Sequence, residues 1–151
     1  MNKPNVVKGI LAGLIGGLVA TAAKSIVERI YPPRTAGQPE PNELLIEKIT
    51  AGSLSVRQEA VAAEAIHWGF GAAAGAAYGA LVEYYPAATA QNGAGFGVAL
   101  MGLTHESTLP ALGLTEEPED QTPREQSSEA MTHVVYGVVT EAVRSLVRKL
   151  L

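Results

Sequence analysis

The sequence predicts an all-α, polytopic membrane protein built as a bundle of four transmembrane helices. Two observations lead to this prediction. Four long apolar segments are separated by prolines, glycines or acidic loops, and residues 69–82 contain no charged side chain. A soluble amphipathic helix should show a charged face along such a stretch. The alternative of a soluble, alanine-rich helical bundle is therefore disfavoured.

The four predicted helices span about residues 5–30, 59–85, 93–113 and 125–151. Each is long enough to cross the hydrocarbon core of a bilayer, which takes about 20 helical residues. The pair Pro32-Pro33 ends the first helix and Pro86 ends the second, because proline cannot continue a helix and disfavours helical backbone at the residue before it. We expect residues 1–151 to form a single integral membrane domain.

The connections between these helices differ in length. Residues 87–92 are few and uncharged, which predicts a tight antiparallel hairpin between the second and third helices. The first long loop contains residues 42–49, whose pattern predicts one short amphipathic helix capped by Asn42. We expect this short helix to lie on the membrane surface.

Composition and motifs exclude several classes of function. The chain has no cysteine, so it has no disulfide framework and no thiolate metal site. Its formal net charge of -4 argues against nucleic acid as a partner, because such proteins present a basic face. The nucleophile-elbow, Walker and H-E-x-x-H motifs are missing from the sequence. We therefore expect a protein that is not an enzyme and whose main surroundings are membrane lipids.

Glycines recur at four-residue spacing, in the pattern of a glycine zipper. The rows are Gly9, Gly13 and Gly17 in the first helix and Gly71, Gly75 and Gly79 in the second. In lipid, small residues at this spacing let helix backbones approach closely. Two such rows exceed what one small bundle needs, which predicts a homo-oligomer or a subunit of a larger membrane complex.

Ionisable residues inside the apolar segments mark a candidate site. Lys24, His67, His105 and His133 each lie eight residues from an end of their segment, which is about 12 Å along a helix. In an alternating bundle these four ends share one side of the membrane, so the four side chains should share one level. Carboxylates at helical spacing accompany them. The predicted polar cluster consists of Lys24, Glu28, Glu64, His67, His105, Glu129 and His133.

A second polar group is expected at the opposite end of the bundle. There Arg144 could neutralise Glu83 and Glu141. Ionisable groups within a membrane are costly and are a functional hypothesis by default.

Three interpretations of the polar cluster stay open. The side chains can be hydrogen-bonded pairs that fix helix register, which fits a structural or accessory subunit. They can form a proton or ion path, which fits a small channel or transporter. They can also bind a metal or haem, because Glu64-x-x-His67 has the spacing found in di-iron bundles. The sequence does not identify a cofactor.

The assembled residues resemble the YagU family of small bacterial inner-membrane proteins of unknown function. The matching positions are Lys24-x-x-x-Glu28 with Pro32-Pro33-Arg34; His67, Phe70, Tyr78, Glu83 and Pro86; His105-x-x-x-x-Pro110-x-x-Gly113-Leu114-Thr115; and Asp120, Glu125, Ser128, Glu129, His133, Glu141 and Arg144. The resemblance implies a multi-pass protein of the bacterial inner (plasma) membrane and supplies no activity. The compact basic cluster near the C-terminus favours cytoplasmic termini.

Overall fold

The computed structural model describes residues 4–35 and 37–151, and every regular element within them is helical. In chain order the elements are α1 (Val6–Ile30), α2 (Pro41–Thr50), α3 (Val56–Tyr84), the 3₁₀ segment η1 (Pro86–Gly93), α4 (Ala94–Leu103), the π-helical turn η2 (Thr104–Thr108), α5 (Leu109–Ala111) and α6 (Pro123–Leu150). This confirms the all-α class. The predicted helix ends differ from the observed ones by at most three residues.

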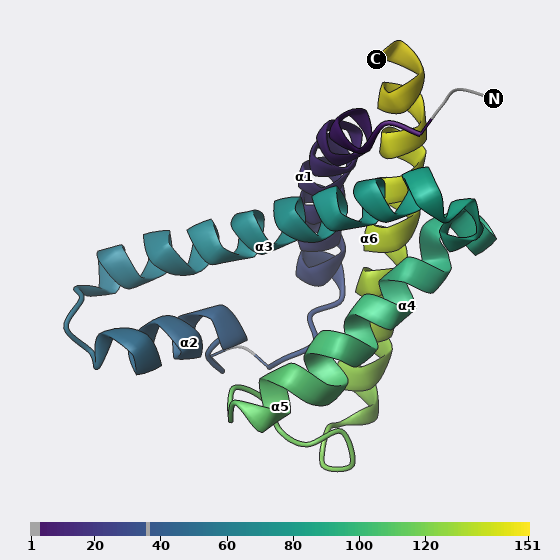
Figure 1. The fold of residues 1–151 in the computed structure, drawn as a ribbon. Helices are drawn as coiled ribbons and strands as arrows, with labels where there is room; N and C mark the ends of the chain where they lie inside the picture. The colour runs from purple at the N-terminus through teal and green to yellow at the C-terminus, as the bar shows by residue number, and fades with distance from the viewer. Residues whose placement is uncertain (1–3, 36) are drawn as a thin grey trace.

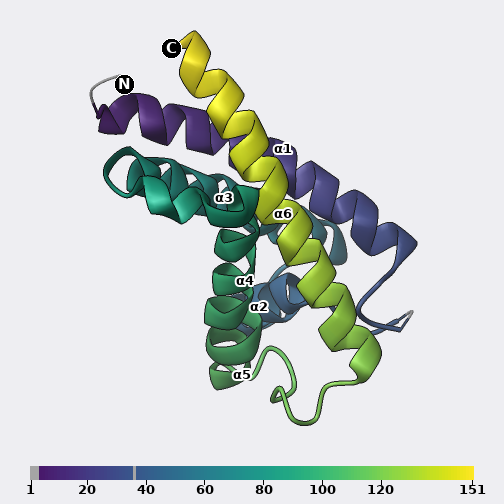
Figure 2. The same ribbon diagram turned by 90° about the vertical axis from the view of Figure 1, so that its right-hand side faces the viewer.

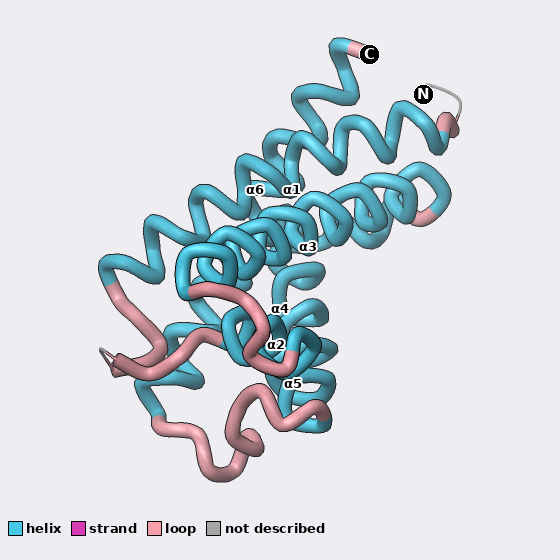
Figure 3. The backbone as a smooth tube through the Cα atoms, turned by 90° about the vertical axis from the view of Figure 1, so that its left-hand side faces the viewer, coloured by secondary structure: helices cyan, strands magenta, loops and turns pink. Residues whose placement is uncertain are grey.

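Helix α1 packs along both α3 and α6, and these are the two most extensive helix contacts in the described chain. In Figure 1, α3 crosses α1 at an angle, and the first half of α3 extends away together with α2. Figure 2 shows α1 and α6 crossing obliquely. The Lys8 ammonium donates a hydrogen bond to the Leu151 carbonyl, so the start of α1 lies beside the end of α6. Figure 3 places most of the long loops at the other end of the molecule.

The glycine rows bring the backbones of α1 and α3 into direct contact. A Cβ atom on Gly13 would lie 2.8 Å from the Cα of Gly79, and one on Gly75 would lie 2.6 Å from the Cα of Gly17. On the other side of α1, a Cβ on Gly16 would lie 2.7 Å from the Thr140 carbonyl oxygen of α6. No side chain fits at these crossings. The two predicted rows therefore serve packing within one chain, and they do not by themselves require a second copy.

Helix α4 packs on α6 rather than back along α3. A Cβ atom on Gly137 would lie 2.7 Å from the Gly97 backbone nitrogen. The η1 turn redirects the chain through Gln91, Asn92 and Gly93, all with positive φ. The predicted turn is thus present, but the hairpin between the second and third helices is wrong as a packing unit, because glycine contacts draw α4 to α6.

Helix α1 buries its small residues and turns several large aliphatic residues outward. On α1, Ala12 and Ala20 are fully buried, whereas Leu11, Ile15 and Val19 are 47%, 42% and 46% exposed. The same helix buries Gly9, Gly13, Gly16 and Gly17. Water-soluble domains place Leu, Ile and Val inside. The arrangement is the reverse of that rule.

One sequence prediction needs correction, and another is not confirmed. The cap of α2 is Glu40, whose side chain forms a capping box with Glu43, because Pro41 occupies the first helical turn and has no N–H to satisfy. The four-helix membrane bundle is not confirmed, since α1 alone among the described helices is long and apolar enough to span a membrane. Charged residues in the first half of α3 and throughout α6 lower their mean hydropathy.

We predict that Gly13→Ala destabilises the fold by about 1–3 kcal/mol, because the added methyl group collides with the α3 backbone. Gly69→Ala is the matched control, since a Cβ atom there meets nothing within 4 Å. Alanine has the higher helix propensity, so the control should be neutral or more stable. Thermal unfolding of the purified variants measures both effects. Equal stabilities of the two variants would contradict the packing described.

Candidate functional site

The chain that follows α1 folds back over the start of α6. The Ser128 hydroxyl donates to the Tyr31 carbonyl at 2.6 Å, and the Arg124 guanidinium donates to the Pro32 carbonyl at 3.1 Å. Paired prolines end α1 at this point, and their fixed φ directs the chain toward α6. Arg34 is thereby carried to the side of α6 that faces the interior.

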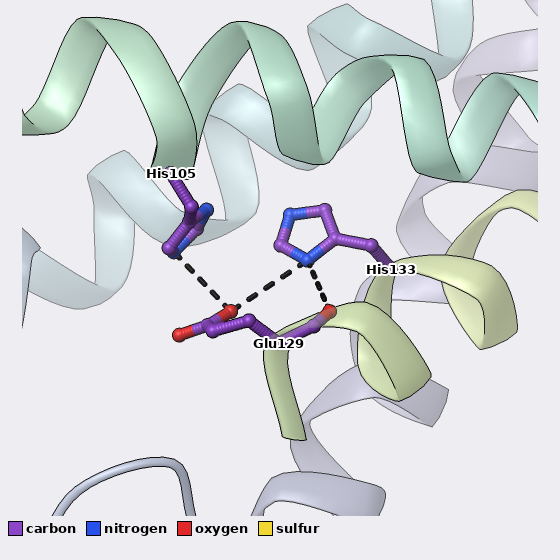
Figure 4. Close-up of side chains that lie close together, drawn as sticks. All are labelled: His105, Glu129 and His133. Atoms are coloured by element: carbon purple, nitrogen blue, oxygen red, sulfur yellow. Dashed lines mark hydrogen bonds and ion pairs between the residues drawn. The ribbon is translucent and has the colours of Figure 1, made fainter. Parts of the chain in front are cut away.

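Glu129 of α6 is the centre of the site, and its side chain is only 3% exposed. Its Oε2 atom lies 3.6 Å from the Lys24 ammonium, 3.3 Å from Nε2 of His105 and 3.6 Å from Nδ1 of His133. Its other oxygen lies 3.7 Å from the Arg34 guanidinium. Figure 4 shows the two imidazole rings and the carboxylate converging from two helices. Four basic or imidazole groups thus surround one buried carboxylate.

Further acidic groups balance the two cations. The Lys24 ammonium lies 2.5 Å from Glu28, and the Arg34 guanidinium lies 3.1 Å from Glu40 and 3.5 Å from Glu125. Burial raises the pKa of the Glu40 carboxyl, and Arg34 opposes this shift. We refer to these groups together as the Glu129 cluster. It consists of Lys24, Glu28, Arg34, Glu40, His105, Glu125, Glu129 and His133.

Hydrogen bonds to the backbone and to a neighbouring hydroxyl orient the two imidazoles. Nδ1 of His133 lies 2.8 Å from the Glu129 carbonyl oxygen, and Nδ1 of His105 lies 3.0 Å from the Thr104 hydroxyl. The Thr104 hydroxyl in turn donates to the Leu100 carbonyl at 2.7 Å. The ring centroids are 4.7 Å apart, with the rings nearly edge to face.

His105 lies on the π-helical turn η2. Pro110 follows closely, and because it has no N–H it cannot continue the regular hydrogen-bond ladder. Within the turn, the hydroxyls of Ser107 and Thr108 donate to the Leu103 carbonyl, at 2.7 and 2.6 Å. Single π turns inside α-helices occur often at functional sites.

The structure brings together five of the seven residues of the predicted polar cluster: Lys24, Glu28, His105, Glu129 and His133. A buried histidine–glutamate cluster is therefore confirmed. Glu64 and His67 lie outside the Glu129 cluster. Glu64 is exposed and accepts a hydrogen bond from the Trp68 indole at 3.1 Å, while Nε2 of His67 lies 3.1 Å from the Ser25 hydroxyl. The predicted Glu64–His67 pair is wrong, because each side chain uses another partner.

The opposite end of the domain carries a second set of ion pairs. Arg144 forms a bidentate pair with Glu141, with both contacts at 2.7 Å. The Tyr78 hydroxyl donates to Glu141 at 2.9 Å. Glu83 pairs with Arg148, at 2.6 and 3.0 Å, rather than with Arg144 as predicted. Arg148 is one helical turn beyond Arg144, which places it at the level of the α3 end.

A polar face of α6 connects these two ends. Between Glu129 and Arg144 the buried positions include Thr132, Tyr136 and Thr140. The Tyr136 hydroxyl donates to the Gly71 carbonyl of α3 at 2.6 Å. The hydroxyl oxygen of Thr140 is buried without a hydrogen-bond partner. The inward side of α6 is therefore polar over most of its length.

Sequence reasoning missed several members of the Glu129 cluster, namely Arg34, Glu40 and Glu125. Helical periodicity does not reach Arg34 and Glu40, which lie in the loop after α1. One feature of the sequence could have indicated Arg34. Pro32-Pro33-Arg34 ends α1 within one turn of the Lys24–Glu28 pair, so Arg34 follows that pair closely.

The comparisons with known proteins identify a family but no activity. Residues 18–142 match a family described as a protein of unknown function, DUF1440. The chain belongs to this family. The match covers every residue of the Glu129 cluster, and it supports an uncharacterised family without testing the narrower YagU resemblance. No curated protein and no solved structure matches the chain.

We predict that Glu129→Gln lowers the free energy of unfolding by about 3–5 kcal/mol, because it leaves Lys24 and Arg34 buried beside an uncharged side chain. Glu64→Gln is the matched control, since Glu64 is exposed and its single bond to Trp68 can persist. Denaturant titration of the two variants compares them directly. A change below about 1 kcal/mol for Glu129→Gln, the usual size for an exposed pair, would contradict its central place.

Proposed function

We propose that this chain is a membrane-embedded domain of the bacterial inner membrane that acts as a structural or accessory subunit. The observation that supports this most is the reversed distribution of side chains. Large aliphatic residues such as Leu11, Ile15 and Val19 face outward, while Thr21, Glu129 and Arg144 are buried.

A lipid environment explains this distribution. In water, each exposed aliphatic side chain forgoes about 1.5–3 kcal/mol that burial would supply, so a soluble fold would turn these residues inward. In a bilayer the lipid tails are as apolar as leucine, and helices associate through small residues and hydrogen bonds instead. The glycine contacts of α1 and the threonines buried along α6 follow that pattern.

The charged residues of α6 are compatible with this environment because the interior ones are paired. Glu129 faces cations from α1 and the first loop, and Arg144 is held by Glu141. Ionisable residues in membranes face the bundle interior and pair with one another. Helix α1 is the segment that is long and apolar enough to cross a bilayer by itself. We propose that α3, the α4–α5 region and α6 cross beside it.

The proposed accessory role rests on the apolar residues at the surface. The outward faces of α1, α3 and α6 carry apolar residues that suit lipids or other apolar helices, including Ile26, Phe70, Leu81, Val138 and Leu146. The Glu129 cluster, in contrast, is engaged within the chain. The surface therefore suits a second copy or a partner subunit in the membrane, and nothing in it favours nucleic acid.

We predict that the chain stays in the membrane fraction after carbonate extraction. Reporter domains fused to the N-terminus and to the C-terminus should lie on the same face, because the start of α1 lies beside the end of α6. We expect this face to be cytoplasmic, because a compact basic cluster lies near the C-terminus. Fusions after residue 35 and after residue 120 test the opposite face. Release by carbonate, or terminal reporters on opposite faces, would overturn the membrane proposal.

Proton or ion transfer is the second candidate, favoured by the polar face of α6 between Glu129 and Arg144. Chains of histidine, carboxylate and hydroxyl groups are the usual relay groups in membranes. We predict for this candidate that purified protein in liposomes carries a proton flux that His133→Ala abolishes and His67→Ala preserves. Liposomes without flux above the protein-free rate exclude the candidate and leave the accessory role.

A further inference from the structure

We propose that His105, Glu129 and His133 bind one divalent transition-metal ion, such as Zn²⁺. One side-chain donor atom from each of the three residues lies within 4.8 Å of the donors of the other two. Two histidines and one glutamate form a ligand set that zinc accepts at sites which keep an open position. This inference goes beyond the proposed accessory role and does not depend on it.

The hydrogen-bond pattern leaves lone pairs facing each other. The Thr104 hydroxyl has one proton, and it donates this proton to the Leu100 carbonyl, which can only accept. The same hydroxyl therefore accepts from Nδ1–H of His105. In the neutral imidazole, Nε2 then carries a lone pair, and it lies 3.3 Å from Oε2 of Glu129. These two acceptor atoms therefore face each other at a distance that one shared cation could bridge.

His133 presents its other ring nitrogen to Glu129, because Nδ1 rather than Nε2 lies 3.6 Å from Oε2. Its Nδ1 lies 2.8 Å from the Glu129 carbonyl oxygen, which can only accept, so Nδ1 carries the proton and Nε2 carries the lone pair. A backbone carbonyl that accepts from one ring nitrogen is the usual partner that orients a metal-binding histidine. Thr104 has this role for His105. Each ring therefore keeps one nitrogen whose lone pair no backbone group or hydroxyl uses, Nε2 in both cases.

The Glu129 carboxylate supplies the independent observation. The Glu129 side chain is only 3% exposed, and its buried Oε2 atom has no hydrogen-bond partner. An unsatisfied charged oxygen in the interior is expensive. Its 3.3 Å distance from Nε2 of His105 matches the edge of a tetrahedron with zinc–ligand bonds of about 2.0–2.1 Å, which is about 3.4 Å. One ion would satisfy the oxygen and the imidazole together.

The surrounding charges permit a dication despite the nearby Lys24 and Arg34. The Glu129 cluster contains these two cations and four carboxylates, which is a formal surplus of two negative charges. A divalent ion cancels that surplus. The Lys24 ammonium is 2.5 Å from Glu28 and 3.6 Å from Oε2 of Glu129, so its charge is shared between two carboxylates. The π-helical turn η2 carries His105 and so sets the position of this ligand.

The test is Zn²⁺ titration by calorimetry of the full chain, purified in mild detergent without an oligohistidine tag. We expect one ion per chain. His105→Ala and His133→Ala should each weaken the affinity at least tenfold, and Thr104→Val, which removes only the orienting hydroxyl, should weaken it by roughly 10–100-fold. His67→Ala is the matched control and should bind as the wild type does, because His67 contacts Ser25.

Co²⁺ substitution adds a readout that does not depend on variants. A tetrahedral cobalt spectrum and X-ray absorption with two imidazoles in the first shell are expected for the wild type. The absence of saturable one-to-one binding would overturn the proposal. So would unchanged affinity in His105→Ala, equal loss in His67→Ala, or a first shell of oxygen atoms alone in the wild type. If a histidine variant fails to fold, the X-ray absorption spectrum of the wild type tests the proposal by itself.

Discussion

The close approach of α1 to α3 and α6 is the constraint on which the rest of the structure depends. Glycines at positions 13, 16, 17 and 75 bring backbones together at distances that no side chain tolerates. Helices packed this closely leave little volume between them for Leu, Ile or Val, so Leu11, Ile15 and Val19 of α1 lie outside. The interior is then stabilised by dispersion contacts between backbones and by hydrogen bonds, which is how helices associate where water supplies no hydrophobic driving force.

Burial of Glu129 follows from the same packing. A carboxylate on the inward face of α6 has no route to solvent, so its charge must be balanced by protein groups. The balancing groups come from four places: Lys24 on α1, Arg34 in the loop after it, His105 on the π turn and His133 one turn along α6. Each of these elements is therefore fixed in register by one buried charge, and the same convergence supplies the donor set of the proposed metal site.

Much of this arrangement could be predicted from the sequence. Prolines 32, 33 and 86 locate two helix ends, and the constant rise of a helix places Lys24, His105 and His133 at one depth. Equal depth was insufficient for Glu64 and His67. His67 contacts Ser25 of α1 instead of Glu129, and Glu64 is exposed in the first half of α3, which extends away together with α2 (Figure 1). Arg34 and Glu40 could not be placed in the site from the sequence, because they lie in an irregular loop, whose path follows no helical periodicity.

We propose that the outward aliphatic face of α1 lies in lipid. The chain has no cysteine, so single cysteines at Ile15 and at Glu119 can be introduced without other changes. Labelling of both variants with a membrane-impermeant maleimide, in native membranes opened to expose both faces, is the most direct measurement. We expect rapid labelling at position 119 and no labelling at position 15 until the membrane is dissolved. Equal labelling of the two positions in intact membranes would contradict it.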